Sequence, residues 1–209
     1  MHLFSYSTFA AAAMVLTFST SAFAAPVFDG TFDEANYQSV TADAGDGVQD
    51  FNGTGLDINK VGFHADDSFV TVGVDSVDDF EFAGDPTTFG RKSFTGFWLE
   101  IATGSDFYFI DMATDGTANA DYVDLYQSAD EITWSLVGSG SAAISSDLEL
   151  RFDASYFANL PADFDFNAQL DGTGEWDDDQ LLGSATGVPE PASIALLGLG
   201  SLLIVSRRR

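Results

Sequence analysis

The chain has 209 residues and no cysteine, so its length suffices for one domain with its own core while disulfides, thiolate metal sites and thiol nucleophiles are excluded. There are 33 acidic residues against seven lysines and arginines, a formal net charge of −26. Such a charge repels phosphate backbones and anionic lipid, which excludes nucleic acid as a partner. Two interpretations of the acids remain, namely solubility in a cation-rich medium and calcium binding by some of the carboxylates.

The first 24 residues have the pattern of a secretory signal peptide. They contain no acid, and an apolar stretch runs from about Phe9 to Phe18. Ala22 and Ala24 then flank Phe23 in the small-x-small form that signal peptidase accepts. The apolar stretch is well under the ~20 residues that a spanning helix needs. We therefore expect residues 1–24 to form a signal helix that is cleaved after Ala24.

Residues 25–187 are dominated by alternation of apolar and polar side chains, which is typical of strands with one buried face. Turn pairs such as Asp115-Gly116 and Asp171-Gly172 separate the alternating runs. This spacing predicts one acidic all-β domain, an antiparallel β-sandwich of the jelly-roll kind. The side chains expected to face inward are Val61/Phe63/Ala65, Val70/Val72/Val74, Phe97/Leu99/Ile101, Ile132/Trp134/Leu136, Leu148/Leu150/Phe152 and Phe164/Phe166/Ala168/Leu170.

Strand parity separates the three tryptophans. Trp134 alternates with aliphatic residues and is expected in the core, whereas Trp98 lies on the outward face beside Glu100. Trp176 lies in an acidic stretch that is too polar to bury. An exposed ring beside carboxylates suits the apolar face and the hydroxyls of a sugar. Trp98, Glu100 and Trp176 are therefore the candidate ligand-binding residues.

Several acidic clusters lie in predicted turns, and the one between residues 171 and 179 is the candidate calcium site. Calcium takes about six to eight oxygen ligands that converge from turns. No cluster has the EF-hand spacing, so calcium is an expectation from composition alone. The candidate ligands are Asp171, Glu175, Asp177, Asp178 and Asp179.

Catalytic residues are not expected. His64 is the only histidine beyond the signal peptide, it lies in a predicted strand, and no Gly-x-Ser-x-Gly elbow is present. A Ser-His-Asp site is therefore not supported. A glycan hydrolase stays open as an alternative, because it needs only two carboxylates about 5 to 9 Å apart, a separation that a sequence does not show.

The C-terminal residues form the most specific motif of the chain. A Pro-Glu-Pro box is followed by the uncharged run 192–206 and by an arginine cluster, so the motif consists of Val188, Pro189, Glu190, Pro191, Arg207, Arg208 and Arg209. In order and spacing it resembles the PEP-CTERM sorting signal, which implies processing by an exosortase, a membrane-embedded enzyme of Gram-negative bacteria. A helix over the apolar run would span only ~22 Å of a ~30 Å hydrocarbon core. We therefore expect residues 188–209 to be a transient inner-membrane anchor.

Three other segments resemble family-nine carbohydrate-binding modules. Residues 28–37 contain Asp-Gly-x-x-Asp-Glu followed by an aromatic residue, as at the opening of those modules. Residues 60–75 resemble their next hairpin, and residues 148–160 resemble their late strand and turn. This resemblance implies a carbohydrate-binding-module-like sandwich that binds sugar.

The sequence as a whole predicts an exported, exosortase-sorted, non-enzymatic protein of the cell surface or extracellular matrix. Signal peptidase and exosortase are the expected processing partners, and extracellular polysaccharide is the expected ligand. Two alternatives belong to other classes. One is a secreted glycan hydrolase, and the other is a calcium-stabilised or ice-binding structural protein.

Overall fold

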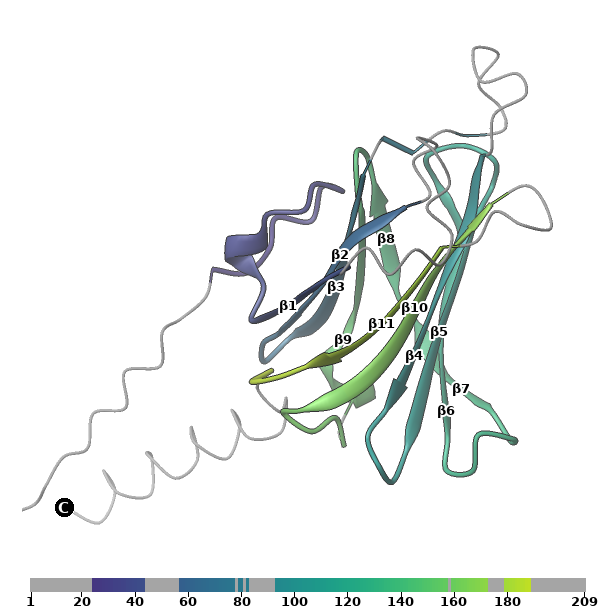
Figure 1. Cartoon of the computed structure of the whole chain (residues 1–209). Helices are drawn as coiled ribbons and strands as arrows, with labels where there is room; N and C mark the ends of the chain where they lie inside the picture. The colour runs from purple at the N-terminus through teal and green to yellow at the C-terminus, as the bar shows by residue number, and fades with distance from the viewer. Residues whose placement is uncertain are drawn as a thin grey trace, which may run out of the picture.

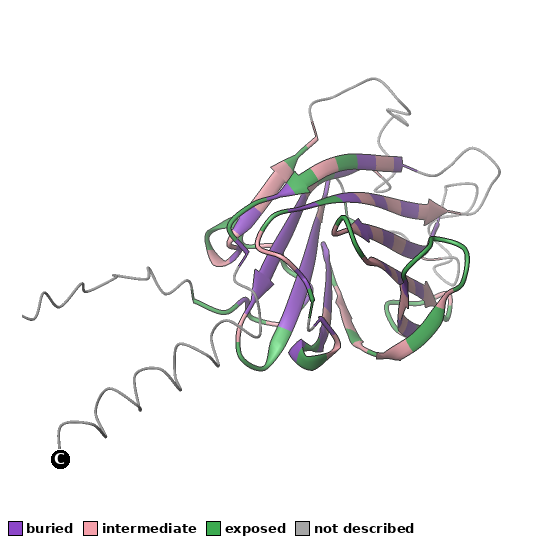
Figure 2. Ribbon diagram, turned by 90° about the horizontal axis from the view of Figure 1, so that it is seen from below, coloured by how far each residue is buried: buried purple, intermediate pink, exposed green. Residues whose placement is uncertain are grey.

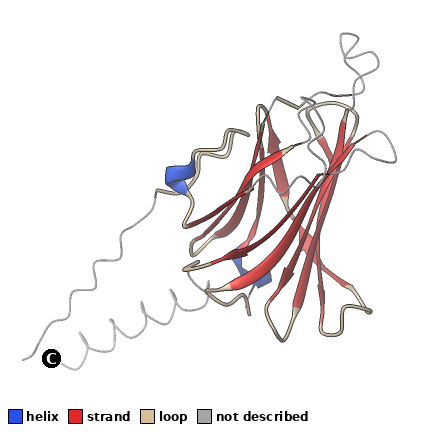
Figure 3. Cartoon of the chain, viewed as in Figure 1, coloured by secondary structure: helices blue, strands red, loops and turns tan. Residues whose placement is uncertain are grey.

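The computed structural model describes residues 24–43, 57–77, 79–80, 82, 93–157, 159–172 and 179–188. Within these ranges the chain forms eleven strands and two 3₁₀-helices, η1 (Glu34–Asn36) and η2 (Ala154–Phe157) (Figures 1 and 3). The strands are β1 (Ser39–Ala42), β2 (Ile58–Ala65), β3 (Phe69–Ser76), β4 (Phe94–Ala102), β5 (Phe107–Thr114), β6 (Ala120–Ser128), β7 (Ser135–Ser139), β8 (Ser141–Ile144), β9 (Leu148–Asp153), β10 (Phe164–Gly172) and β11 (Asp179–Ala185).

The strands form two sheets that face each other as a sandwich (Figure 1). One sheet has five strands in the order β1-β2-β3-β9-β8, and the other has six in the order β11-β10-β4-β5-β6-β7. Every strand pairing is antiparallel. The predicted all-β sandwich is therefore confirmed.

The core lies between the two inner faces, where alternate side chains of both sheets meet. Phe63 of the five-stranded sheet packs edge-on against Phe164 and Phe166 of the six-stranded sheet, with ring centroids 5.0 Å apart in both pairs. Five of the six predicted inward sets are buried. Alternation identified them because a strand places every second side chain on the same face.

Both sides of the sandwich are closed by contacts between the sheets. On one side β7 and β8 form a nearly continuous run, in which β7 pairs with β6 and β8 pairs with β9. Gly140 joins the two, and a Cβ atom there would lie 2.6 Å from the Phe152 ring, so this crossing requires glycine. On the other side the Thr41 hydroxyl donates to the Ser184 carbonyl oxygen at 3.1 Å, which joins β1 to β11.

The predicted inward set that includes Trp134 is wrong. Ile132 is 83% exposed and Leu136 is 59% exposed, and Trp134 is half-buried on the outer side of the sheet. A turn causes the difference, since Oδ1 of Asp130 accepts hydrogen bonds from the N–H groups of Ile132 at 3.0 Å and Thr133 at 2.8 Å. The apparent alternation therefore spans a turn and the edge strand β7, which begins after Trp134.

The N-terminal segment, residues 26–38, covers the outer face of the five-stranded sheet (Figure 1). Phe32 and Tyr37 stack with ring centroids 4.6 Å apart and lie over Gly62 and Gly73. A Cβ atom at Gly62 would come within 2.7 Å of Tyr37 Cγ and 2.8 Å of Phe32 Cε2. The two glycines therefore leave the space that this pair of rings fills.

Glu149 of β9 anchors the same segment. Its side chain is completely buried, and Oε1 accepts a hydrogen bond from the Tyr37 hydroxyl at 2.8 Å. Oε2 accepts from the N–H groups of Asp29 at 2.9 Å and Gly30 at 3.0 Å. The Asp-Gly motif of residues 28–37 therefore has a structural role here, because its backbone satisfies a buried carboxylate.

Candidate ligand-binding site

The outer face of the six-stranded sheet carries a hollow of about 430 Å³. It lies over β4, β5 and β6 and is bordered by the turn that precedes β7. Four of its lining residues are aromatic and three are carboxylates: Trp98, Phe109, Tyr126 and Trp134, with Glu100, Asp111 and Glu131. The hollow therefore combines apolar ring surface with a few polar groups, as small-molecule sites commonly do.

Alternation and register together assemble this site. Trp98 and Glu100 face outward because the residues between and beside them fill the core. In the ladder, Glu100 stands opposite Phe109 of β5, and Phe109 stands opposite Tyr126 of β6. Trp98 stands opposite Asp111 in the neighbouring row. Two cross-strand rows, one after the other, thus bring rings and carboxylates together on one face.

The rings form a connected group with Phe109 at its centre. The Phe109 ring centroid lies 6.1 Å from that of Trp98, 6.4 Å from that of Tyr126 and 5.7 Å from that of Trp134. The interplanar angles are between 38° and 55°, so the rings are tilted and not closely stacked on one another. All four side chains are half-buried. Their remaining exposed surface is apolar area that a ligand can cover.

The turn before β7 delivers both Trp134 and Glu131 to the site. The Ser128 hydroxyl donates to Oδ1 of Asp130 at 3.0 Å, and this carboxylate in turn accepts from the turn's backbone N–H groups. Glu131 has φ = +59°, the left-handed region that non-glycine residues rarely adopt. Strained backbone of this kind is often found at functional sites, which draws attention to this turn.

The Asp111 carboxylate lies in the hollow beside the Tyr122 hydroxyl. Its partial burial raises the pKa above the ordinary value, and the nearby charge of Asp124 adds to this, whereas the Tyr122 hydroxyl opposes it by hydrogen bonding. That hydroxyl lies 3.3 Å from both Asp111 oxygens. The geometry leaves the Asp111 carboxylate ready to accept a further hydrogen bond from a ligand.

A strip of amide side chains continues the same face beyond the hollow. Asn167 of β10 stands opposite Glu100 and Gln169 opposite Trp98 in the ladder. Gln180 of β11 donates from Nε2 to Oδ1 of Asn167 at 2.7 Å. Amides can both donate to and accept from hydroxyl groups, so this strip extends the polar surface beside the rings.

Of the predicted ligand-binding residues, the structure brings Trp98 and Glu100 together, while Trp176 lies outside the described residues. Phe109, Asp111 and Tyr126 were missed although they alternate with buried residues, as parity alone indicates. Trp134 and Glu131 were missed because they belong to a turn. What a single sequence does not show is the cross-strand register that places them side by side.

The structure describes two of the five predicted calcium ligands, Asp171 and Asp179. Asp179 is buried, and its Oδ2 accepts a hydrogen bond from the Ile58 N–H at 2.6 Å. Oδ1 of Asp171 accepts from Nε2 of Gln169 at 3.0 Å. Among the residues that the structure describes, no group of three or more histidine or acidic side chains is arranged to hold a metal ion. Glu175, Asp177 and Asp178 lie outside them, so calcium binding here stays a prediction.

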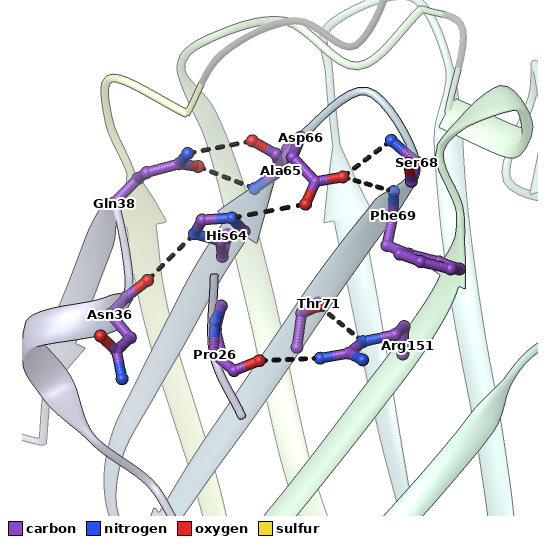
Figure 4. A network of polar contacts seen from close by, with 10 residues as sticks. All are labelled: Pro26, Asn36, Gln38, His64, Ala65, Asp66, Ser68, Phe69, Thr71 and Arg151. Carbon is purple, nitrogen blue, oxygen red and sulfur yellow. Dashed lines mark hydrogen bonds and ion pairs between the residues drawn. The ribbon is translucent and has the colours of Figure 1, made fainter. Parts of the chain in front are cut away.

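His64 belongs to the network that holds the N-terminal segment in place (Figure 4). Its Nδ1 lies 2.9 Å from the Asn36 carbonyl oxygen and its Nε2 lies 3.9 Å from Asp66 Oδ2. Burial lowers its pKa, although the Asn36 carbonyl opposes the shift. In the same network Nη2 of Arg151 donates to the Pro26 carbonyl oxygen at 3.0 Å. His64 therefore has a structural setting on the sheet opposite the hollow.

Comparison with protein families adds one match. Residues 187–209 match the model of the PEP-CTERM protein-sorting motif. The chain carries a PEP-CTERM sorting signal. This signal indicates export as a membrane-anchored precursor that an exosortase processes. Comparison with curated proteins gives no match, and the resemblance to family-nine carbohydrate-binding modules is not confirmed.

The PEP-CTERM signal starts inside the folded domain. Val188 is 1% exposed and packs into the core, and its N–H donates to the Ala162 carbonyl oxygen at 3.0 Å. The Gly187 N–H donates to Oδ1 of Asp163 at 2.9 Å, and its φ of +72° favours glycine. The first two residues of the matched range, Gly187 and Val188, are therefore fixed to the sandwich.

The other processing residues lie mostly outside the described part of the chain. This holds for Ala22, for Pro189, Glu190 and Pro191, and for Arg207, Arg208 and Arg209. Ala24 is the first described residue and is exposed. Over the described ranges, no helix has both the length and the apolar character needed to cross a membrane. The predicted signal helix and the tail helix fall outside those ranges.

Proposed function

We propose that this PEP-CTERM protein is a non-enzymatic glycan-binding protein that acts at the cell surface or in the extracellular matrix. The observation that carries the proposal is the aromatic hollow on the six-stranded sheet, where Trp98 and Trp134 flank Phe109. Sugar rings have one apolar face that stacks on an aromatic side chain and hydroxyls that need polar partners. The hollow and its neighbouring amides supply both.

The openness of this face supports a binding role over a purely structural one. Half-buried aromatic rings at the centre of a sheet face cost free energy in water unless something covers them. The opposite sheet shows how the chain covers such a face when packing is the purpose, since residues 26–38 lie across it. Among the residues that the structure describes, no segment lies across the hollow on the six-stranded sheet in this way. A ligand is therefore the occupant that we infer.

The residues that line the hollow support a catalytic function less well than a binding function. Glu100, Asp111 and Glu131 are acceptors for sugar hydroxyls, and His64, which a Ser-His-Asp mechanism would need, lies on the other sheet. A glycan hydrolase that uses two of the three carboxylates is the rival function. The same experiment separates the two, because a hydrolase would shorten the oligosaccharides that it binds.

The first prediction concerns the two tryptophans. In a glycan array followed by titration of the processed protein, Trp98→Ala and Trp134→Ala should each weaken binding at least tenfold, which corresponds to about 1.4 kcal/mol. Since both rings are half-exposed, unfolding free energies should change by no more than about 1 kcal/mol. Chromatography of the bound oligosaccharides should show no cleavage products.

Two variants serve as controls. Leu182→Ala removes a side chain that is 70% exposed on the same face, and it should leave binding unchanged. Phe97→Ala removes the completely buried neighbour of Trp98 and should cost about 3 to 5 kcal/mol of stability. Wild-type affinity in both tryptophan variants, or the absence of any bound glycan, would overturn the proposal. Cleavage products would replace it by the hydrolase.

A further inference from the structure

The charged residues that line the hollow are acidic, as far as the structure describes them. Three carboxylates line it, and none of the described lining residues is lysine or arginine. In the part of the chain that the structure describes, the lysine and arginine side chains are Lys60 on β2 and Arg151 on β9, both on the other sheet. Each already has a partner, since Lys60 Nζ lies 2.8 Å from Glu34 Oε2 and Arg151 donates to the Pro26 carbonyl. The described residues around the hollow therefore offer a ligand only negative charge.

Such a hollow discriminates among glycans by their charge. A uronic acid or sulfated sugar meets like charges at close range, which costs binding free energy. A neutral sugar gains only ordinary hydrogen bonds from its hydroxyls. An ammonium group gains charge-assisted hydrogen bonds to the carboxylates. It also gains attraction to the faces of the tryptophan rings.

The turn before β7 places a ring and a carboxylate together. Trp134 and Glu131 are three residues apart in this turn, and both line the hollow. The left-handed backbone at Glu131 has an energetic cost, since glycine or asparagine would adopt this conformation more readily than glutamate. The presence of glutamate at this position is explained if its carboxylate contacts the ligand.

We infer that the glycan held in this hollow carries free amino groups. Its ring stacks on the aromatic side chains, and its ammonium group is held by Glu100, Asp111 and Glu131. This inference rests on the proposed glycan-binding function and narrows it to one substrate class, the amino sugars whose nitrogen is not acetylated.

The test compares matched oligosaccharides on the processed protein. Tryptophan fluorescence is followed while the protein is titrated with three oligosaccharides of equal length. These are oligomers of glucosamine, of N-acetylglucosamine and of galacturonic acid. The free-amine oligomer should bind at least about tenfold more tightly than its acetylated counterpart, and the galacturonic acid oligomer should bind least tightly. Raising the salt concentration should reduce the preference, because salt screens charge–charge attraction.

Variants that replace a carboxylate by a neutral amide test whether the preference for the free amine comes from the hollow. Glu100→Gln and Glu131→Gln should each reduce the preference for the free amine severalfold and leave binding of the acetylated oligomer close to wild type. Asp67→Asn removes one charge from the exposed β2–β3 turn of the other sheet and should leave the preference unchanged. An equal effect of Asp67→Asn would mean that the diffuse charge of the protein is responsible, and the inference would be wrong.

The remaining outcomes separate this inference from the function on which it rests. If the acetylated oligomer binds as tightly as the free amine, or if neutral glycans bind on the array while both oligomers fail, the amino-sugar assignment is wrong and glycan binding stands. If no glycan binds at all, the proposed function fails together with the inference.

Discussion

The outer faces of the two sheets differ in what covers them. On β2 and β3 of the five-stranded sheet, burial is almost continuous along the strand, whereas on β4, β5 and β10 of the six-stranded sheet it alternates (Figure 2). One face carries small and hydrogen-bonded residues under residues 26–38. The other carries half-exposed rings and carboxylates. Strand parity thus indicates which face a side chain occupies, but it does not indicate whether another segment, such as residues 26–38, covers that face.

Residue size and hydrogen bonding account for this difference. Gly62 and Gly73 leave room for the rings of Phe32 and Tyr37, so the N-terminal segment can approach the backbone of the sheet. Burial raises the pKa of Tyr37, and the negative charge of Glu149 raises it further, so the hydroxyl stays protonated and donates to that carboxylate. Large outward rings on the six-stranded sheet would hold a covering segment away. The covered face is therefore built for stability, and the open one is the face on which we propose that a ligand binds.

The largest expected effect comes from comparing two glutamates, Glu149 of β9 and Glu100 of β4, that both face outward from their strands. Glu149→Ala removes the acceptor of three hydrogen bonds under the N-terminal segment, so it should lower the free energy of unfolding by about 3 to 5 kcal/mol. Glu100→Ala should change it by no more than about 0.5 kcal/mol, because this side chain lies on the open face. Urea denaturation measures both. Equal losses would show that the two faces do not differ as described.

Much of the fold followed from alternation, because burial of one face per strand leaves a direct trace in the sequence. The inward sets of β2, β3, β4, β9 and β10 were predicted for this reason. The N-terminal cover was not predicted, because Gly62 and Gly73 look like ordinary small residues until their neighbours in space are known. Packing between segments that are distant in the chain leaves no periodic signal.

The site was predicted only in part, for a related reason. Trp98 and Glu100 were identified by parity, and Phe109 follows the same rule within its own strand. The register that joins the three is a property of strand pairing and not of any one strand. Trp134 was misassigned because the backbone N–H groups of Ile132 and Thr133 donate to the Asp130 carboxylate and form a turn where alternation predicted a strand.

A buried acid at the seam between the sheets gives an intermediate effect and a pH dependence. Burial raises the pKa of Asp179 to about 6, the hydrogen bond from the Ile58 N–H opposes the shift, and the charges of Asp57 and Asp43 add to it. Because the folded-state pKa is above the unfolded value, the protonated carboxyl stabilises the fold below about pH 4, and this contribution is lost as the pH rises through 6. Asp179 is thus like Glu149 on the covered face, because both are buried carboxylates that accept hydrogen bonds from backbone N–H groups.

The substitution Asp179→Asn tests this sign. Asparagine keeps an oxygen for the Ile58 N–H but does not ionise, so the variant should match the wild type near pH 4 and exceed its unfolding free energy by about 1 to 2 kcal/mol at pH 7. Denaturation curves at a series of pH values provide the measurement. A variant that is less stable than the wild type at pH 7 would show that the ionised form is the stabilising one.

The smallest expected effect concerns Glu131, which lies at the edge of the open face and has a φ of +59°. Glu131→Asn introduces a residue that tolerates the left-handed region, so it should raise the free energy of unfolding by up to about 1 kcal/mol, or the melting temperature by about 2 to 4 °C. Glu131→Gln removes the same charge but keeps the strained backbone, and it should melt with the wild type in a calorimetric scan. Both variants should lose preference for the free-amine oligomer, because both lack the carboxylate. If the two variants melt together, the left-handed backbone at this position does not limit stability. If Asn is more stable than Gln while both bind poorly, the strain at Glu131 serves the ligand, in contrast to the covered face, where the residues serve the fold.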